Sequence, residues 1–364
     1  MTGTKPIVDL FIDANILLAL AFALWWGARR IMARSAIRQD YTRQLRLMKL
    51  FLAVTILSPL VASLAARAGT ALAPETPLTV SDIAVAAFLR GDIAMPAVRF
   101  EALLNLRDAT VDRFLAGQSA WMTILAAALT FGALVHAVRL AATIWRIRAA
   151  LGRSYLWRRT ARVDIRVSDR VAAPFAVRGL RRRHVVVPSA MLTRPRELKI
   201  VLAHEFQHLR GGDTEWEIVF ELLRPILYWN PAFAALKRQF EHLRELGCDQ
   251  QVLDRGNVAA ADYVRCLLDH CERRLREPLP RAMNVAFVKA GTSRLALEDR
   301  VMAMLDPAPT RHGRLALPVL ALLLASGVSV AALSVRQPGD WSHDRLMLST
   351  VVNLERIHAI NGRY

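Results

Sequence analysis

Residues 201–213 read VLAHEFQHLRGGD and contain the pattern HExxH, from His204 to His208. Residues four apart on an α-helix lie on one face, so both imidazoles can reach a single metal ion. Glu205 lies about 100° further around the same turn, where its carboxylate can reach a water beside that ion but is poorly placed as a third ligand. Two nitrogen ligands and one general base are what a zinc hydrolase needs. The alternative is an amphipathic helix that carries two histidines by coincidence, and the surrounding sequence disfavours it.

A third protein ligand for zinc is expected downstream, because catalytic zinc sites use three protein ligands and leave one position open. The segment ELGCD places Glu245 and Asp249 four residues apart, on one face of a helix. We expect Glu245 to bind the metal and Asp249 to accept a hydrogen bond from the outer ring nitrogen of a ligating histidine. Glu241, His242 and Cys248 are the competing candidates for the third ligand.

The composition predicts a membrane protein. The chain has 364 residues, of which 54% are hydrophobic, and its formal net charge is +18. Four apolar stretches are long enough to cross a bilayer as helices. They are Leu10–Ala28, Leu50–Ala66, Trp121–Val138 and Leu315–Val335.

These stretches predict a mainly α-helical, integral membrane fold with a small α+β domain. Residues 1–67 hold two transmembrane helices joined by a basic cytoplasmic loop, and residues 68–118 form an extracytoplasmic loop. Residues 119–138 are the third transmembrane helix, 139–314 a cytoplasmic zincin-like peptidase domain with a small sheet, 315–335 the fourth transmembrane helix, and 336–364 a short extracytoplasmic tail.

Charge sets the expected orientation. Basic residues are dense after the first stretch and after the third, whereas residues 68–118 are slightly acidic. By the positive-inside rule, the HExxH region lies inside and both termini lie outside. The basic face favours contact with anionic lipid over nucleic acid, because the chain contains no recognisable nucleic-acid-binding module.

Two short strands are expected ahead of the HExxH helix. Val163–Val167 and His184–Val187 are rich in β-branched residues, and Ala173–Gly179 between them is expected to be a loop. Pro195 suits the first turn of the helix that follows. The second strand is expected to offer its edge to a substrate backbone or to lie in the core, and the two readings are compatible.

The chain resembles the BlaR/MecR-type antirepressor zinc metallopeptidases of bacterial membranes, over roughly Leu10–Val335. The matching motifs are PFAVRG at Pro174–Gly179, HVVVPSAML at His184–Leu192, LAHEFQHLRGGD at Leu202–Asp213, YWNP at Tyr228–Pro231 and RELGCDQQVL at Arg244–Leu253. The resemblance implies a gluzincin-like peptidase with His204, His208 and Glu245 as zinc ligands and Glu205 as catalytic base. It also implies a multi-pass protein of the bacterial cytoplasmic membrane.

One departure from the family bears on the signal. Sensor members carry an outer penicillin-binding domain with an SxxK serine after the fourth span. Here only residues 336–364 follow, and no SxxK occurs in the chain. We therefore expect the penicillin-binding sensor domain to be lacking and the stimulus not to be acylation by a β-lactam.

The favoured function is a membrane-embedded zinc endopeptidase that cleaves an intracellular protein in transmembrane signalling, either a repressor-like regulator or itself. The alternatives are a non-proteolytic receptor with a structural metal site and a quality-control protease for membrane proteins. The expected partners are the protein substrate and the bilayer, with no direct contact to nucleic acid. The sequence leaves the oligomeric state open, a homodimer included.

Overall fold

The computed structural model describes residues 5–35, 37–72, 85, 87–171, 173–179, 181–256, 258–276, 294–306, 316–335, 350 and 352. By internal contacts the chain divides into two compact units. The first unit contains Met1–Ala28, Leu50–Ala128 and Pro318–Tyr364, and the second contains Arg29–Lys49 and Leu129–Leu317.

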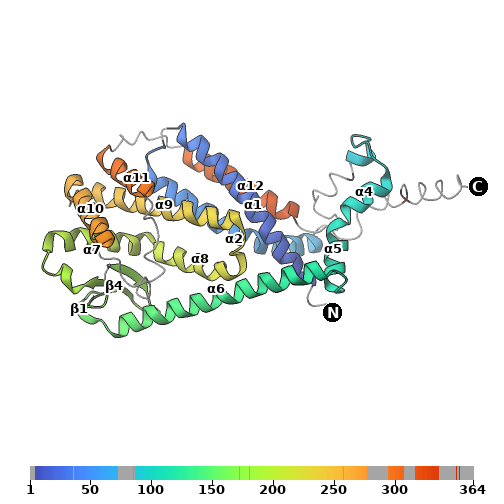
Figure 1. The fold of residues 1–364 in the computed structure, drawn as a ribbon. Coiled ribbons are helices and arrows are strands. Elements are labelled where there is room, and N and C mark those ends of the chain that lie inside the picture. Colours follow the sequence, from blue (N-terminus) through green and yellow to red (C-terminus); the bar gives the residue numbers. More distant parts are fainter. Residues whose placement is uncertain are drawn as a thin grey trace, which may run out of the picture. The chain divides into compact units, whose positions relative to one another are not determined.

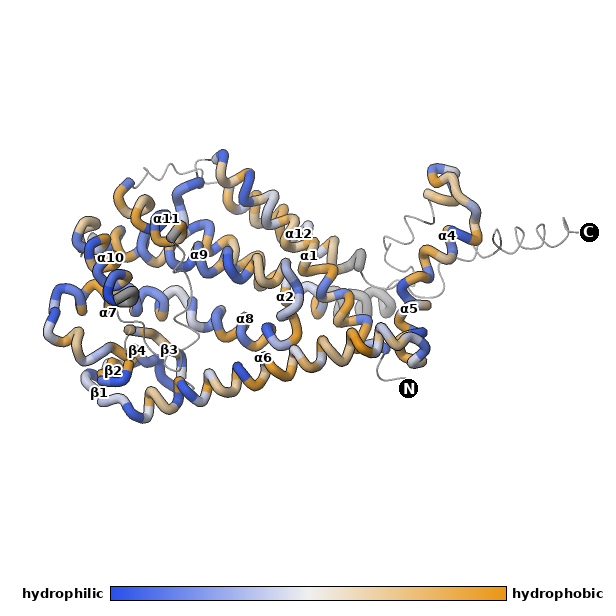
Figure 2. Tube along the Cα trace, in the orientation of Figure 1, coloured by the Kyte–Doolittle hydropathy of each residue, from blue (hydrophilic) through white to orange (hydrophobic). Residues whose placement is uncertain are grey.

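Four apolar helices correspond to the predicted spans (Figure 1). They are α1 (Lys5–Ala33), α2 (Tyr41–Leu72), α6 (Ala120–Gly152) and α12 (Ala316–Val335). Within the described residues, three stretches are long and apolar enough to cross a membrane, namely Lys5–Ala33, Tyr41–Val61 and Ala120–Gly152. Figure 2 shows the apolar residues along α1 and α6. The apolar stretch of α12, Leu317–Ala332, is shorter, so the fourth span stays a prediction.

Short helices of the first unit also lie between α2 and α6 in the part of the chain that the structure describes. These are α4 (Ala97–Leu104) and α5 (Leu106–Leu115). Arg107 of α5 forms an ion pair of 2.7 Å with Asp13 of α1, and the rings of Trp25 and Phe51 pack 5.4 Å apart between α1 and α2. Helix α1 is therefore joined to α5 by a polar contact and to α2 by an aromatic contact.

The second unit contains a four-stranded sheet. Its strands are β1 (Tyr155–Arg159), β2 (Val163–Ser168), β3 (Phe175–Arg178) and β4 (Arg183–Pro188), in the order β1-β2-β4-β3. Strands β2 and β4 are parallel, and the two outer strands pair antiparallel to them.

The sheet corrects two expectations. Residues 173–179 are not wholly a loop, because Phe175–Arg178 pairs with β4 as an edge strand. Strand β4 therefore has no free edge, since β2 and β3 flank it on both sides. Its valines Val185, Val186 and Val187 are fully buried, which agrees with a core strand.

Further helices follow the sheet along the chain in the second unit. They are α7 (Pro195–Gly211), α8 (Asp213–Leu227), α9 (Pro231–Asp254), α10 (Ala260–Arg276) and α11 (Arg294–Leu305), with a short 3₁₀ turn at Ser189–Met191. Pro195 occupies the first turn of α7, as expected. The side chain of Asn230 caps α9 by accepting hydrogen bonds from the next two backbone amides.

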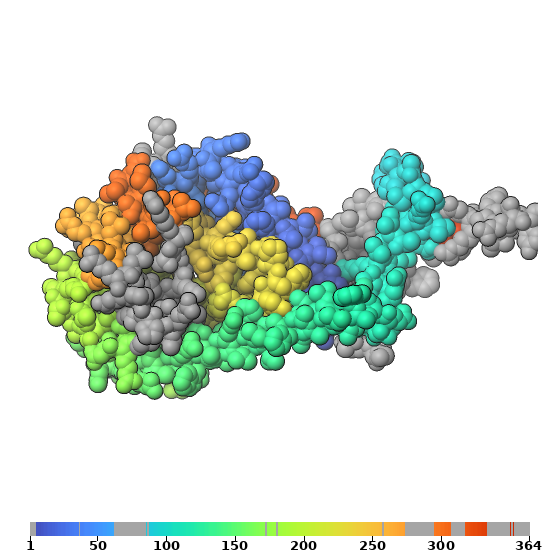
Figure 3. Space-filling view, viewed as in Figure 1, coloured from blue at the N-terminus to red at the C-terminus, as the bar shows by residue number. Residues whose placement is uncertain are grey.

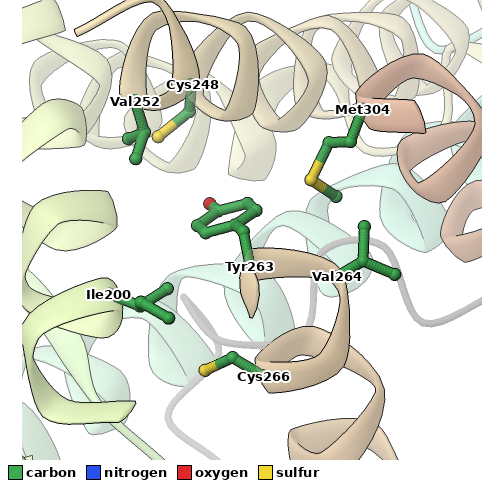
Figure 4. Packing of buried hydrophobic residues seen from close by; sticks show 7 residues of the cluster. All are labelled: Ile200, Cys248, Val252, Tyr263, Val264, Cys266 and Met304. Atoms are coloured by element: carbon green, nitrogen blue, oxygen red, sulfur yellow. The ribbon is translucent and has the colours of Figure 1, made fainter. Parts of the chain in front are cut away.

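Two apolar clusters fix α7 in place. On one side, Leu198 and Leu209 of α7 pack against Val185 and Val187 of the sheet. On the other side, Ile200 joins a cluster with residues of α9, α10 and α11 (Figure 4). Helices α10 and α11 contact each other, and Figure 3 shows them adjacent on one face of the unit. The HExxH helix therefore lies between the sheet and the helical layer.

Candidate metal centre

Three side chains from α7 and α9 converge on one point. The Nε2 atoms of His204 and His208 lie 3.0 Å apart. Glu245 of α9 faces both, with one carboxylate oxygen 3.5 Å from Nε2 of His204 and the other 3.8 Å from Nε2 of His208. Ligands about 2.0–2.2 Å from a tetrahedral zinc ion lie roughly 3.3 Å from one another. The triangle of these donors thus fits one ion of that size.

Cys248 is a second candidate for the third ligand. Its thiol and the two histidines form a group whose ligand atoms all lie within 4.8 Å of one another. The Sγ atom, however, lies 3.3 Å from Nδ1 of His204, the ring nitrogen on the far side from Glu245. The other competitors are engaged elsewhere, since Glu241 pairs with Lys237 at 2.8 Å and His242 with Asp299 at 3.5 Å.

The outer nitrogen of each histidine has a hydrogen-bond partner. Nδ1 of His208 lies 2.8 Å from Oδ2 of Asp213. Nδ1 of His204 lies 2.7 Å from the hydroxyl of Tyr263, which in turn donates to Asp249 at 2.7 Å. Both rings are thereby oriented with Nε2 toward Glu245, the arrangement that metal-binding histidines use.

Asp249 lies next to His204 as expected, but not as its nearest partner. Its Oδ1 atom is 3.4 Å from Nδ1 of His204, and the Tyr263 hydroxyl is closer to that nitrogen, at 2.7 Å. Asp213 takes the corresponding place beside His208. The sequence alone assigns no role to Asp213 or Tyr263, and nothing in the local spacing links Tyr263 to His204.

The turn between α7 and α8 explains how Asp213 reaches His208. Gly212 has a φ of 72°, a left-handed conformation that ends α7 and starts α8 at once. Glycine adopts this conformation at little cost in free energy because it has no Cβ atom. The chain therefore reverses within one residue, and Asp213 returns toward the last turn of α7.

Two arginines hold Glu245. Arg244 donates to its Oε1 at 3.0 Å, and Arg300 of α11 lies 3.3 Å from its Oε2. Arg300 also donates two hydrogen bonds to Asp249, at 2.7 and 2.8 Å. Burial alone would raise the pKa of Glu245, but His204 and the two guanidinium groups bring the pKa well below its ordinary value. A carboxylate has enough lone pairs to accept these bonds and still bind a cation.

The electrostatics of the cluster favour a cation between the histidines. Burial lowers the pKa of His208, but the charge of Cys248 and the hydrogen bond to Asp213 outweigh it and raise the pKa to about 10. Burial likewise acts against a charged His204, while Cys248, Tyr263 and Asp249 raise its pKa well above the ordinary value. Acidic groups that favour positive charge on these rings also favour a metal ion in place of the protons.

Glu205 lies half-buried on α7, one residue from the first histidine. Among the described residues it makes no hydrogen bond or ion pair, in contrast to Glu245, Asp249 and Asp213.

The chain matches a known protein family. A family model described as BlaR1 peptidase M56 matches residues 10–304, which include the sheet and all the helices that form the centre. No curated protein matches this chain. The family is one of membrane-associated metallopeptidases, in agreement with the His/His/Cys group and the apolar helices.

Proposed function

The chain belongs to the BlaR1 peptidase M56 family, and from this premise we propose that it is a zinc-dependent endopeptidase of the membrane. One observation carries the proposal: the Nε2 atoms of His204 and His208 and the carboxylate of Glu245 converge at ligand-to-ligand distances. Two imidazoles and one carboxylate are a common ligand set for catalytic zinc.

In this proposal His204, His208 and Glu245 bind the metal. Zinc there would lower the pKa of a water molecule and polarise the scissile carbonyl group. Glu205 accepts a proton from the attacking water and delivers it to the leaving amine, so it acts first as a base and then as an acid. Asp213 and the Tyr263–Asp249 pair keep both rings in the tautomer that leaves Nε2 free.

Glu245 is proposed as third ligand in preference to Cys248. A metal between Cys248 and Nδ1 of His204 would have to break the hydrogen bond between that nitrogen and the Tyr263 hydroxyl, and Nδ1 of His208 is bonded to Asp213. Binding through the two Nε2 atoms and Glu245 leaves all these hydrogen bonds in place.

The proposal extends to location and substrate. Basic residues around the HExxH region support a cytoplasmic peptidase domain in the bacterial cytoplasmic membrane, with both termini outside. The substrate would be an intracellular protein, a repressor-like regulator or a second copy of the chain itself within a homodimer. The bilayer is the other partner, and no direct contact with nucleic acid is expected.

Replacement of Glu205 by Gln tests the mechanism. The full chain in lipid nanodiscs would be incubated with cytoplasmic proteins, and the fragments identified by mass spectrometry. We expect the variant to retain zinc and to lose about a hundredfold or more in cleavage rate, because general acid–base catalysis contributes that much. Arg210→Gln, an exposed change on the same helix, should cleave like the parent. Undiminished cleavage by the zinc-loaded Glu205→Gln variant would exclude Glu205 from the reaction.

A non-proteolytic receptor is the second candidate, and the position of Cys248 is what favours it. With Cys248 as a fourth ligand the site would be closed and structural. Such a receptor would hold zinc but give no fragments that depend on Glu205. A quality-control protease would give fragments of many membrane proteins instead of one regulator.

A further inference from the structure

The start of the second membrane helix belongs to the peptidase unit. Helix α2 contributes its first nine residues, up to Lys49, to the second compact unit. It lies against α9, where a Cβ atom added to Gly247 would come within 3.3 Å of Leu45. The backbone amide and hydroxyl of Thr42 both donate to the side chain of Gln250, at 3.0 and 3.2 Å. This part of α2 thus packs directly on the helix that carries Glu245.

Lys49 ends this segment and contacts the metal centre. Its ammonium group donates to the backbone carbonyl of Gly211 at 2.8 Å and to Oδ1 of Asp213 at 2.5 Å. The other carboxylate oxygen of Asp213 lies 2.8 Å from Nδ1 of His208. Lysine, aspartate and histidine therefore form one hydrogen-bonded series that runs from α2 to a candidate ligand.

The ion pair between Lys49 and Asp213 is largely shielded from water. The side chains of Lys49 and Asp213 are only 15% and 5% exposed, so water replaces either partner poorly. Removing one of the two partners of a buried carboxylate costs free energy, because the carboxylate is left incompletely hydrogen-bonded.

We propose that Lys49 is a positioning residue for His208: through Asp213, the amino-terminal part of the second membrane helix holds this ligand in the geometry that binds the metal. The inference rests on the proposed function and adds a regulatory consequence. Residues of α2 from Leu50 onward belong to the other unit, so a change in that unit that moves α2 would withdraw Lys49 and weaken the metal site.

Zinc affinity of the full chain in nanodiscs tests the proposal, measured by competition with a chromophoric chelator. We expect Lys49→Met to weaken zinc binding roughly tenfold, since loss of a partner behind a metal ligand costs about 10–100-fold. Lys49→Arg should restore most of the affinity, because the charge is kept. Arg46→Met removes the same charge from an exposed position one turn earlier on α2 and should leave zinc affinity unchanged.

A double variant separates positioning from general stability. Asp213→Asn already breaks the series, so adding Lys49→Met to it should weaken zinc binding no further. The visible spectrum of the cobalt-substituted protein should change in Lys49→Met and return in Lys49→Arg, and thermal melting would identify a variant that has merely unfolded.

The outcomes separate the two proposals. A parent protein that binds no zinc would overturn the proposed function and this inference with it. A parent that binds zinc tightly, together with a folded Lys49→Met variant of equal affinity, would overturn the role of Lys49 alone. Equal losses from Lys49→Met and Arg46→Met would also contradict it, because a general effect of charge would then explain both.

Discussion

Tyr263 is a side chain whose hydroxyl and ring have separate roles. The ring packs in the cluster with Ile200 and Met304, and Figure 4 shows the hydroxyl pointing toward Cys248. We expect Tyr263→Phe to keep this packing but to leave His204 and Asp249 without a shared partner. Zinc affinity should fall about tenfold, while the free energy of unfolding falls by only about 1–3 kcal/mol.

Chelator competition and chemical denaturation of the same sample measure both quantities. Ile200→Val, which removes one methylene from the same cluster, is the control for packing. If Tyr263→Phe and the control bind zinc equally well, the hydroxyl has no part in the metal site.

Protons and metal should compete at His208. The metal-free centre raises the pKa of this residue to about 10, above the ordinary value of 6.5. The protonated ring therefore stabilises the metal-free fold fully below pH 6.5, and this stabilisation is lost as the pH rises from 6.5 through 10. Zinc binds the neutral ring, so at pH 7 its binding must release a proton and must strengthen as the pH rises.

Isothermal titration in two buffers of different ionisation enthalpy counts the protons released. We expect at least one per zinc at pH 7 and a higher zinc affinity at pH 8 than at pH 6. Zinc binding without proton release would show that the rings are already neutral and that the acids around them do not act as described.

The spacing rules reach only part of the centre. They link residues three or four positions apart on one helix, and so predicted the pairs His204/His208 and Glu245/Asp249, which the structure brings together. Tyr263, Arg300 and Lys49 come from three other helices. Their positions depend on how those helices pack, which no short pattern records.

At the scale of elements, Gly247 allows α2 to approach α9. A Cβ atom there would lie 3.3 Å from the Cδ2 atom of Leu45 and 3.4 Å from the backbone oxygen of Tyr41. We expect Gly247→Val to force the two helices apart and to destabilise the second unit by about 1–3 kcal/mol. Thermal melting in nanodiscs measures the change.

Gly152→Val is the matched control, because a side chain at that position of α6 would meet nothing within 4 Å. Equal melting temperatures for the two variants would mean that the close approach of α2 to α9 contributes no stability.

The sheet was only half predictable. Strands β2 and β4 are buried and rich in β-branched residues, so their sequences identify them. Strand β1 reads YLWRR and is exposed along its whole length, so it lacks the alternation that marks a half-buried strand. Strand β3 has four residues, too few for a periodic pattern, and its place in the sheet is visible only from its antiparallel pairing with β4.

At the scale of the whole molecule, a bound metal should link α7 to α9 and so stabilise the fold. Zinc bound by α7 and α9 stabilises the folded state by mass action, by about 2.7 kcal/mol at one hundred times its dissociation constant. We expect removal of zinc by a chelator to lower the melting temperature of the parent but not that of His204→Ala. An equal drop in both would show that the chelator acts elsewhere.

The chain's general character was readable from composition and motifs: a mainly helical membrane protein of this peptidase family. Its division into two compact units was not. Domain boundaries predicted from sequence fall where the hydropathy changes. Here the boundary between the units falls within α2, a single helix that contributes residues to both. The contacts of Thr42 and Gly247 join the start of α2 to α9, and hydropathy does not report such contacts.

X-ray absorption spectroscopy of the zinc-loaded protein tests the central claim most directly. Binding by His204, His208 and Glu245 predicts only nitrogen and oxygen neighbours, at about 2.0–2.2 Å, with the scattering pattern of two imidazoles. A sulfur neighbour at about 2.3 Å would place Cys248 on the metal and contradict the proposed ligand set.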